Sequence, residues 1–105
     1  MTEKSQKILD RRNVPFVMVT KAVLKDRTLK ASDKSVYSVL CMYADNRTSD
    51  CFPLRKTIME DAGVSDKTLR NSLRKLQEKG YIEIERRHNS KGQAANRYIL
   101  LDVEN

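Results

Sequence analysis

The chain has 105 residues, a length that suits one domain with a modest hydrophobic core and leaves little room for a separate catalytic domain. Its 21 Lys and Arg residues outnumber its 14 Asp and Glu residues, so the formal net charge is +7 and a polyanionic partner is indicated. The longest mainly apolar stretch, Ser35 to Ala44, is too short to span a bilayer, and the first residues lack a signal-peptide core. We therefore expect a cytoplasmic protein with no membrane partner.

Residues that commonly carry metal or catalytic chemistry are few. Cys41 and Cys51 form no Cys-x-x-Cys pair, and the single His88 cannot complete a metal site with them. Free cysteines are often buried, so core thiols are expected. No Ser or Cys nucleophile with an orienting carboxylate can be assigned beside His88. We predict no catalysis, no cofactor and no small-molecule ligand.

The beginning of the chain is polar and leads into a short apolar run. The polar composition of residues 1–13 predicts a flexible basic tail. We expect residues 14–105 to form the folded domain. The run from Phe16 to Val19 predicts a short strand. Thr20 can then cap a brief helical turn that extends through Leu24.

Two helices are predicted next from capping residues and apolar spacing. Ser32 is the expected N-cap of the first helix, since its hydroxyl can accept a backbone hydrogen bond. The apolar residues that follow have the spacing of one buried helical stripe: Val36, Val39, Leu40, Tyr43 and Ala44. The second helix starts near Phe52-Pro53, because proline suits a first helical turn, and it ends at Gly63. Its inward residues are Ile58, Met59 and Ala62.

A third helix is predicted between its N-cap, Ser65, and Gly80, which can adopt the left-handed conformation after a helix end. The stretch Ala62-Gly63-Val64-Ser65 before it has the length and the glycine of a helix-turn-helix turn. The third helix buries Leu69, Leu73 and Leu76, which leaves a cationic exposed face. Arginine, asparagine and lysine suit base edges and phosphates of the major groove, although any amphipathic surface helix also carries charge outward.

The remainder of the chain predicts a hairpin. Residues 81–85 and 98–101 have strand patterns, and the turn-rich residues between them carry several cations. Such a hairpin can reach an adjacent phosphate backbone or minor groove, or it can be an ordinary solvated tip. The predicted fold is therefore α+β, a winged helix-turn-helix with a three-helix core, a carboxyl-terminal two-stranded wing and a short amino-terminal strand.

Five stretches carry a family resemblance: LKASDK at 29–34, CFP at 51–53, GVSDKTL at 63–69, LQEKGYI at 76–82 and NRY at 96–98. Through them, the chain from Phe16 to Leu101 resembles the winged helix-turn-helix domains at the amino terminus of Gram-positive plasmid replication initiators and phage replisome organisers. Leu54 and Met59 depart from the small residues usual in that family. The resemblance implies DNA recognition by the helix at 66–79, with the hairpin as wing and replication proteins as further partners.

We accordingly predict sequence-specific binding of double-stranded DNA, in plasmid or phage replication and maintenance or in transcriptional regulation. The expected DNA contacts are Lys56, Thr57, Ser65, Lys67, Thr68, Arg70, Asn71, Arg74, Lys75, Arg86, Arg87, Lys91, Gln93, Asn96 and Arg97. A homodimer is expected on DNA, because one small domain reads few base pairs. The main alternative is a winged-helix protein assembly module of a replication or mobile-element complex. RNA binding is weaker, because no aromatic residues interleave the basic face.

Overall fold

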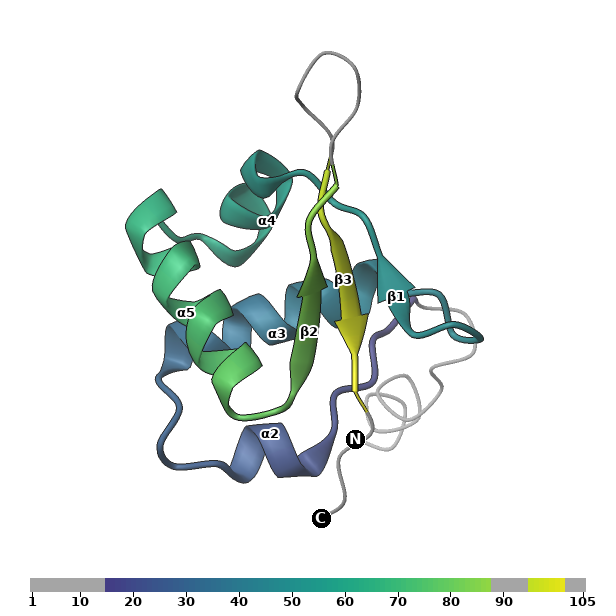
Figure 1. Ribbon diagram of the computed structural model, residues 1–105. Helices are drawn as coiled ribbons and strands as arrows, with labels where there is room; N and C mark the ends of the chain where they lie inside the picture. Colours follow the sequence, from purple (N-terminus) through teal and green to yellow (C-terminus); the bar gives the residue numbers. More distant parts are fainter. Residues whose placement is uncertain (1–14, 88–94, 102–105) are drawn as a thin grey trace, which may run out of the picture.

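Helices packed against a small sheet form the part of the chain that the computed structural model describes, residues 15–87 and 95–101 (Figure 1). Its helices are α2 (Lys21–Lys25), α3 (Ala31–Tyr43), α4 (Arg55–Ala62) and α5 (Asp66–Glu78). Its strands are β1 (Asp50–Cys51), β2 (Ile82–Glu85) and β3 (Arg97–Leu100). This architecture confirms the predicted α+β winged helix-turn-helix class. None of these helices is long and apolar enough to cross a membrane.

The sheet is antiparallel, with β3 between β1 and β2. Tyr98 at its centre faces Cys51 on one neighbouring strand and Ile84 on the other. The outer edge of β2 is joined to α5, because the backbone N–H of Ile84 donates a hydrogen bond to the side-chain oxygen of Gln77 at 3.0 Å. This bond fixes the last turn of α5 against the base of the hairpin.

The predicted strand at Phe16–Val19 was wrong. The chain has no regular structure at these positions, and the side chains of Phe16 and Met18 are 62% and 81% exposed. The third strand is instead β1, which lies between α3 and α4 in the sequence. A strand needs a partner for its backbone N–H and C=O groups. The apolar character of residues 16–19 does not indicate whether a neighbouring strand is available to pair with them.

The start of the first long helix also differs from the prediction. The N-cap of α3 is Lys30, so Ser32 lies inside the helix. Asp33 accounts for the earlier start, because its Oδ2 accepts a hydrogen bond from the backbone N–H of Lys30 at 2.8 Å. The first N–H groups of a helix have no partner within the helix, and a side chain three residues on can satisfy one of them.

The buried stripe of α3 was predicted only in part. Val36, Val39 and Leu40 are buried, but Tyr43 is 42% exposed and Tyr37 is buried instead. Tyr43 lies in the last turn of α3, where its hydroxyl donates a hydrogen bond to Asp61 of α4. A helical position beside the expected stripe therefore enters the core, and α3 contacts α4, α5 and two strands of the sheet.

Within the described residues, one hydrophobic core joins the helices to the sheet. Its members are Val23, Leu29, Val36, Tyr37, Val39, Leu40, Cys51, Ile58, Leu69, Leu73, Leu76, Tyr81, Ile82 and Tyr98. The predicted α5 stripe is confirmed, since all three leucines are buried, and each fully buried side chain of this size stabilises the fold by about 1.5–3 kcal/mol. Cys51 is a core thiol and Cys41 is half-buried; burial raises the pKa of both thiols to about 11.

The turn between α4 and α5 has the predicted conformation. Gly63 ends α4 in the left-handed region, with φ 70° and ψ 37°, and its N–H donates to the carbonyl of Met59 at 2.9 Å. Ser65 then caps α5 by accepting a hydrogen bond from the backbone N–H of Thr68 at 3.2 Å. Gly80 follows α5 with φ 81°, also as predicted.

Gly63→Val is expected to lower the free energy of unfolding by about 1–2 kcal/mol, because a β-branched residue resists the left-handed conformation. A Cβ at this position would meet no neighbouring atom within 4 Å, so the loss would come from the backbone alone. Urea unfolding measures the difference. Gly63→Asn is the matched control and should lose less, because asparagine adopts this conformation more readily. Equal stability of the valine variant and the parent would contradict the assignment of strain.

Candidate nucleic-acid interface

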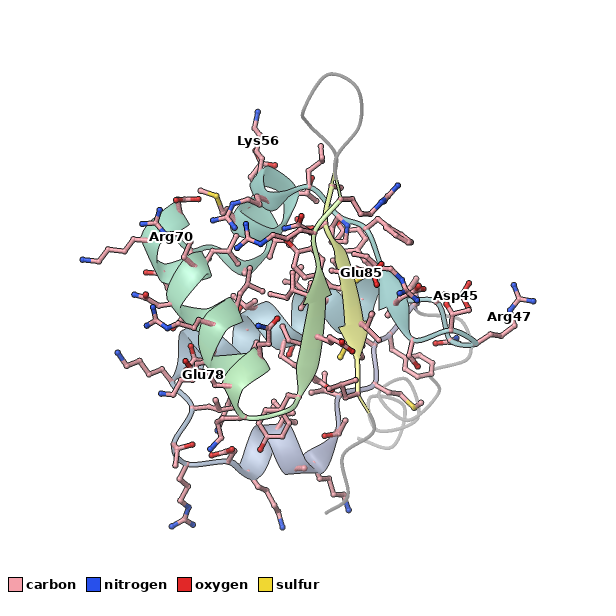
Figure 2. All side chains as sticks on the ribbon, viewed as in Figure 1. Asp45, Arg47, Lys56, Arg70, Glu78 and Glu85 are labelled. Atoms are coloured by element: carbon pink, nitrogen blue, oxygen red, sulfur yellow. The ribbon has the colours of Figure 1, made fainter. Side chains whose placement is uncertain are left out.

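The exposed face of α5 carries the side chains that the sequence placed there. Lys67, Asn71 and Arg74 are exposed on the side of the helix away from the buried leucines. Arg70 is exposed beside them, whereas Thr68 is half-buried. From α4, Lys56 is exposed and Thr57 is half-buried. Figure 2 shows Lys56 and Arg70 toward the same end of the molecule, and Glu78 at the other end of α5, nearer to α2.

A carboxylate at the first position of α5 holds two arginines. Asp66 Oδ1 lies 2.7 Å from Arg55 Nη2, and its Oδ2 lies 3.1 Å from Arg70 Nη1. The hydrogen bond from Arg55 is the main reason that the pKa of Asp66 lies below its usual value. Arg55 and Asp66 were not among the side chains predicted from the sequence to contact DNA. The spacing of Asp66 and Arg70, four residues apart on a helix, was a usable signal for one of the two pairs.

A second carboxylate fixes how α5 is rotated on α3. Asp33 is buried, and its Oδ1 accepts a hydrogen bond from the hydroxyl of Ser72 at 2.6 Å. Its Oδ2 accepts the backbone N–H of Lys30 and lies 3.7 Å from Lys75 Nζ. Lys75, a predicted DNA contact, is thus drawn toward the protein interior. Because a buried charge needs such partners, this cluster orients α5 with Asn71 outward.

Arg97, another predicted DNA contact, is engaged within the sheet. Its Nε lies 2.8 Å from Asp50 Oδ2 of β1, and its Nη1 lies 3.5 Å from Glu85 Oε2 of β2. Hydrogen bonds from Thr48 and then Arg97 hold the pKa of Asp50 below its usual value. The guanidinium joins all three strands, so the structure does not bring Arg97 together with the α5 side chains.

The base of the hairpin presents two exposed arginines, Arg86 and Arg87. The guanidinium carbon of Arg87 lies 4.8 Å from the centre of the Phe52 ring, a cation–π contact that holds this side chain beside the segment leading into α4. Asn96, at the start of the returning strand, is half-buried. The remaining predicted hairpin residues, Lys91 and Gln93, lie outside the described residues, as does His88.

Residues 27–82 match a family model described as a helix-turn-helix domain. The match covers more than half of the chain and includes α3, α4, α5 and the turn at Gly63. The chain belongs to this helix-turn-helix domain family. No curated protein and no solved structure matches it. Helix-turn-helix domains bind DNA through the second helix of the motif, so the family indicates DNA as the partner.

Asp33→Ala is expected to lower the free energy of unfolding by about 2–4 kcal/mol, because it leaves buried donors without an acceptor. Ser72→Ala alone should cost about 1 kcal/mol, the net value of one hydrogen bond. Urea unfolding of both single variants and the double variant measures their coupling. If the two losses simply add, Asp33 and Ser72 do not act as a pair.

Proposed function

We propose that this helix-turn-helix protein binds double-stranded DNA sequence-specifically, with α5 in the major groove and the β2–β3 hairpin beside it. The observation that carries the proposal is the exposed row of Lys67, Asn71 and Arg74 on the helix that follows the turn. Arginine can pair with guanine O6 and N7, asparagine with adenine N6 and N7, and lysine with phosphate. The row therefore contains both base-reading and phosphate-binding groups.

We assign the contacts with the phosphate backbones that flank the groove to side chains outside this row. Lys56 and Thr57 lie at the start of α4, Ser65 and Thr68 lie at the start of α5, and Arg86 and Arg87 lie at the base of the hairpin. The first backbone N–H groups of α5 add a favourable dipole for an anion. Lys91, Gln93 and Asn96 complete the proposed contacts of the hairpin.

The process we propose is replication or maintenance of a plasmid or phage, with transcriptional regulation as the second candidate. The support is the resemblance of five stretches between residues 29 and 98 to replication initiators and replisome organisers. We include a homodimer on a two-fold site, because a single α5 reads few base pairs. The family match favours DNA binding over an assembly module, and helix-turn-helix domains are typically not enzymes.

Selection of bound fragments from a genomic library tests both parts of this proposal. The purified chain should enrich fragments that share a sequence, and two-fold repeats in that sequence would support the dimer. Enrichment near replication origins supports replication, whereas enrichment near promoters supports regulation. A chain that binds neither fragments nor heparin at low salt would contradict DNA binding and favour the assembly module.

Asn71→Ala and Arg74→Ala should each weaken binding to the selected sequence by about 1–3 kcal/mol and relax base preference, because base-edge contacts specify sequence. Titration on selected and scrambled duplexes measures both effects. The matched comparison is substitution of Arg86, Arg87 and Lys91, which should weaken binding to all duplexes similarly. Each lost phosphate contact should flatten the slope of log K against log salt by about 0.9. If Asn71 and Arg74 affect neither affinity nor selectivity, α5 is not the reading helix.

Asp66→Asn is expected to tighten binding to scrambled duplexes by about threefold, because it removes a carboxylate beside the phosphates and releases Arg55 and Arg70. Binding to the selected duplex should change less, so discrimination falls. Titration of both duplexes at low salt measures the ratio. Glu60→Gln, an exposed carboxylate on α4, is the matched control for charge. An equal gain on both duplexes would show that Asp66 contributes nothing to selectivity.

A further inference from the structure

A second group of cations lies away from the exposed row of Lys67, Asn71 and Arg74 on α5, which we call the reading face. Lys21 and Lys25 belong to α2, Arg27 lies in the following loop, and Lys30 is the N-cap of α3. All four are exposed, and none has an ion-pair partner among the described residues. We call these four residues the α2–α3 surface. Figure 1 shows α2 at the opposite end of the molecule from α4.

The carboxylates of the same segment do not neutralise this surface. Asp26 is directed inward, where it accepts hydrogen bonds from the hydroxyls of Thr28 and Tyr81, each at 2.5 Å, and pairs with Lys79 at 3.4 Å. Asp33 is buried in its cluster with Ser72. Both carboxylates of residues 21–34 therefore have partners other than these four cations, which stay exposed at the surface.

Glu78 lies at the end of α5, beyond the reading face. Lys67, Asn71, Arg74 and Glu78 follow one another at helical spacing, and Glu78 is the last and exposed residue of the helix. Figure 2 shows Glu78 on the part of α5 nearer to α2. A carboxylate repels phosphate, so a backbone held along α5 is expected to leave the helix before Glu78. The α2–α3 surface then lies outside that footprint.

We propose that the α2–α3 surface binds the phosphate backbone of a second DNA segment while α5 holds the first. The inference rests on the proposed function and adds a second site to it. Lysine and arginine side chains on a five-residue helix and a loop can reach phosphates but offer no long helix to enter a groove. Binding of the second segment is therefore independent of sequence and strongly dependent on salt.

A capture assay with the full chain tests this inference. The duplex selected from the library is immobilised and saturated with protein, and a labelled duplex of unrelated sequence is then added. The variant Lys25→Gln/Arg27→Gln/Lys30→Gln should capture about tenfold less of the second duplex, because phosphate contacts are lost. Its affinity for the immobilised duplex should stay at the parent value. Circular dichroism and thermal unfolding confirm that each variant is folded.

The control variant is Asn46→Asp/Arg47→Glu, in the exposed loop before β1. It changes the net charge by the same amount, because one negative charge is added and one positive charge is reversed. It should capture the second duplex as well as the parent does. An equal loss in the control would show that only net charge matters and would overturn the proposed site.

The other outcomes separate this inference from the proposed function. If the triple variant loses affinity for the immobilised duplex to the same extent, the surface contacts the first segment and the inference fails. If the parent captures labelled polyglutamate but no second duplex, the surface takes an acidic protein and the inference also fails. The Asn71→Ala/Arg74→Ala variant is tested in the same assay. If it still binds the immobilised duplex but no longer captures the second one, the second duplex is held by α5 of another protomer, and the inference fails. A parent that binds no duplex contradicts the proposed function itself.

Discussion

The position of α5 depends on the burial of one stripe of leucines. Leu69, Leu73 and Leu76 are removed from water against α3 and the sheet, and this burial decides which side of the helix faces solvent. Hydrophobic burial is not directional, however, and it tolerates some rotation. The hydrogen bond between Asp33 and Ser72 supplies the direction, because a buried carboxylate is costly unless its partners are correctly placed. Together they determine where Asn71 and Arg74 point.

Carboxylates also decide which cations are available to a partner. Asp50 and Glu85 hold Arg97, Asp33 attracts Lys75, and Asp66 holds Arg55 and Arg70. The net charge of +7 therefore does not describe the surface that a polyanion meets. Exposed ion pairs contribute little to stability, so pairs such as Asp66 with Arg70 can exchange with phosphate at small cost. The buried partner of Lys75 makes that exchange less favourable there.

The sheet connects the hairpin to the helix-turn-helix unit. β1 comes from the segment between α3 and α4, so pairing of β1 with β3 attaches the returning strand of the hairpin to the helical core. Arg97 reinforces this attachment, and Gln77 joins α5 to β2. The contact of Arg87 with Phe52 adds a link from the hairpin base to the segment before α4. The hairpin and α5 are thus oriented relative to each other by several independent interactions.

Features that depend on neighbouring residues were predictable from the sequence alone. The period of the leucines in α5, the Ser65 cap and the left-handed glycines at 63 and 80 were all predictable, because periodicity, capping and backbone strain are local. The folded structure was needed for the features that depend on distant partners. It excluded a strand at Phe16–Val19, formed one at Asp50–Cys51, buried Tyr37 in place of Tyr43, and directed Lys75 and Arg97 toward carboxylates. Strand pairing and ion pairing join residues far apart in the chain, and no local pattern records which groups will meet.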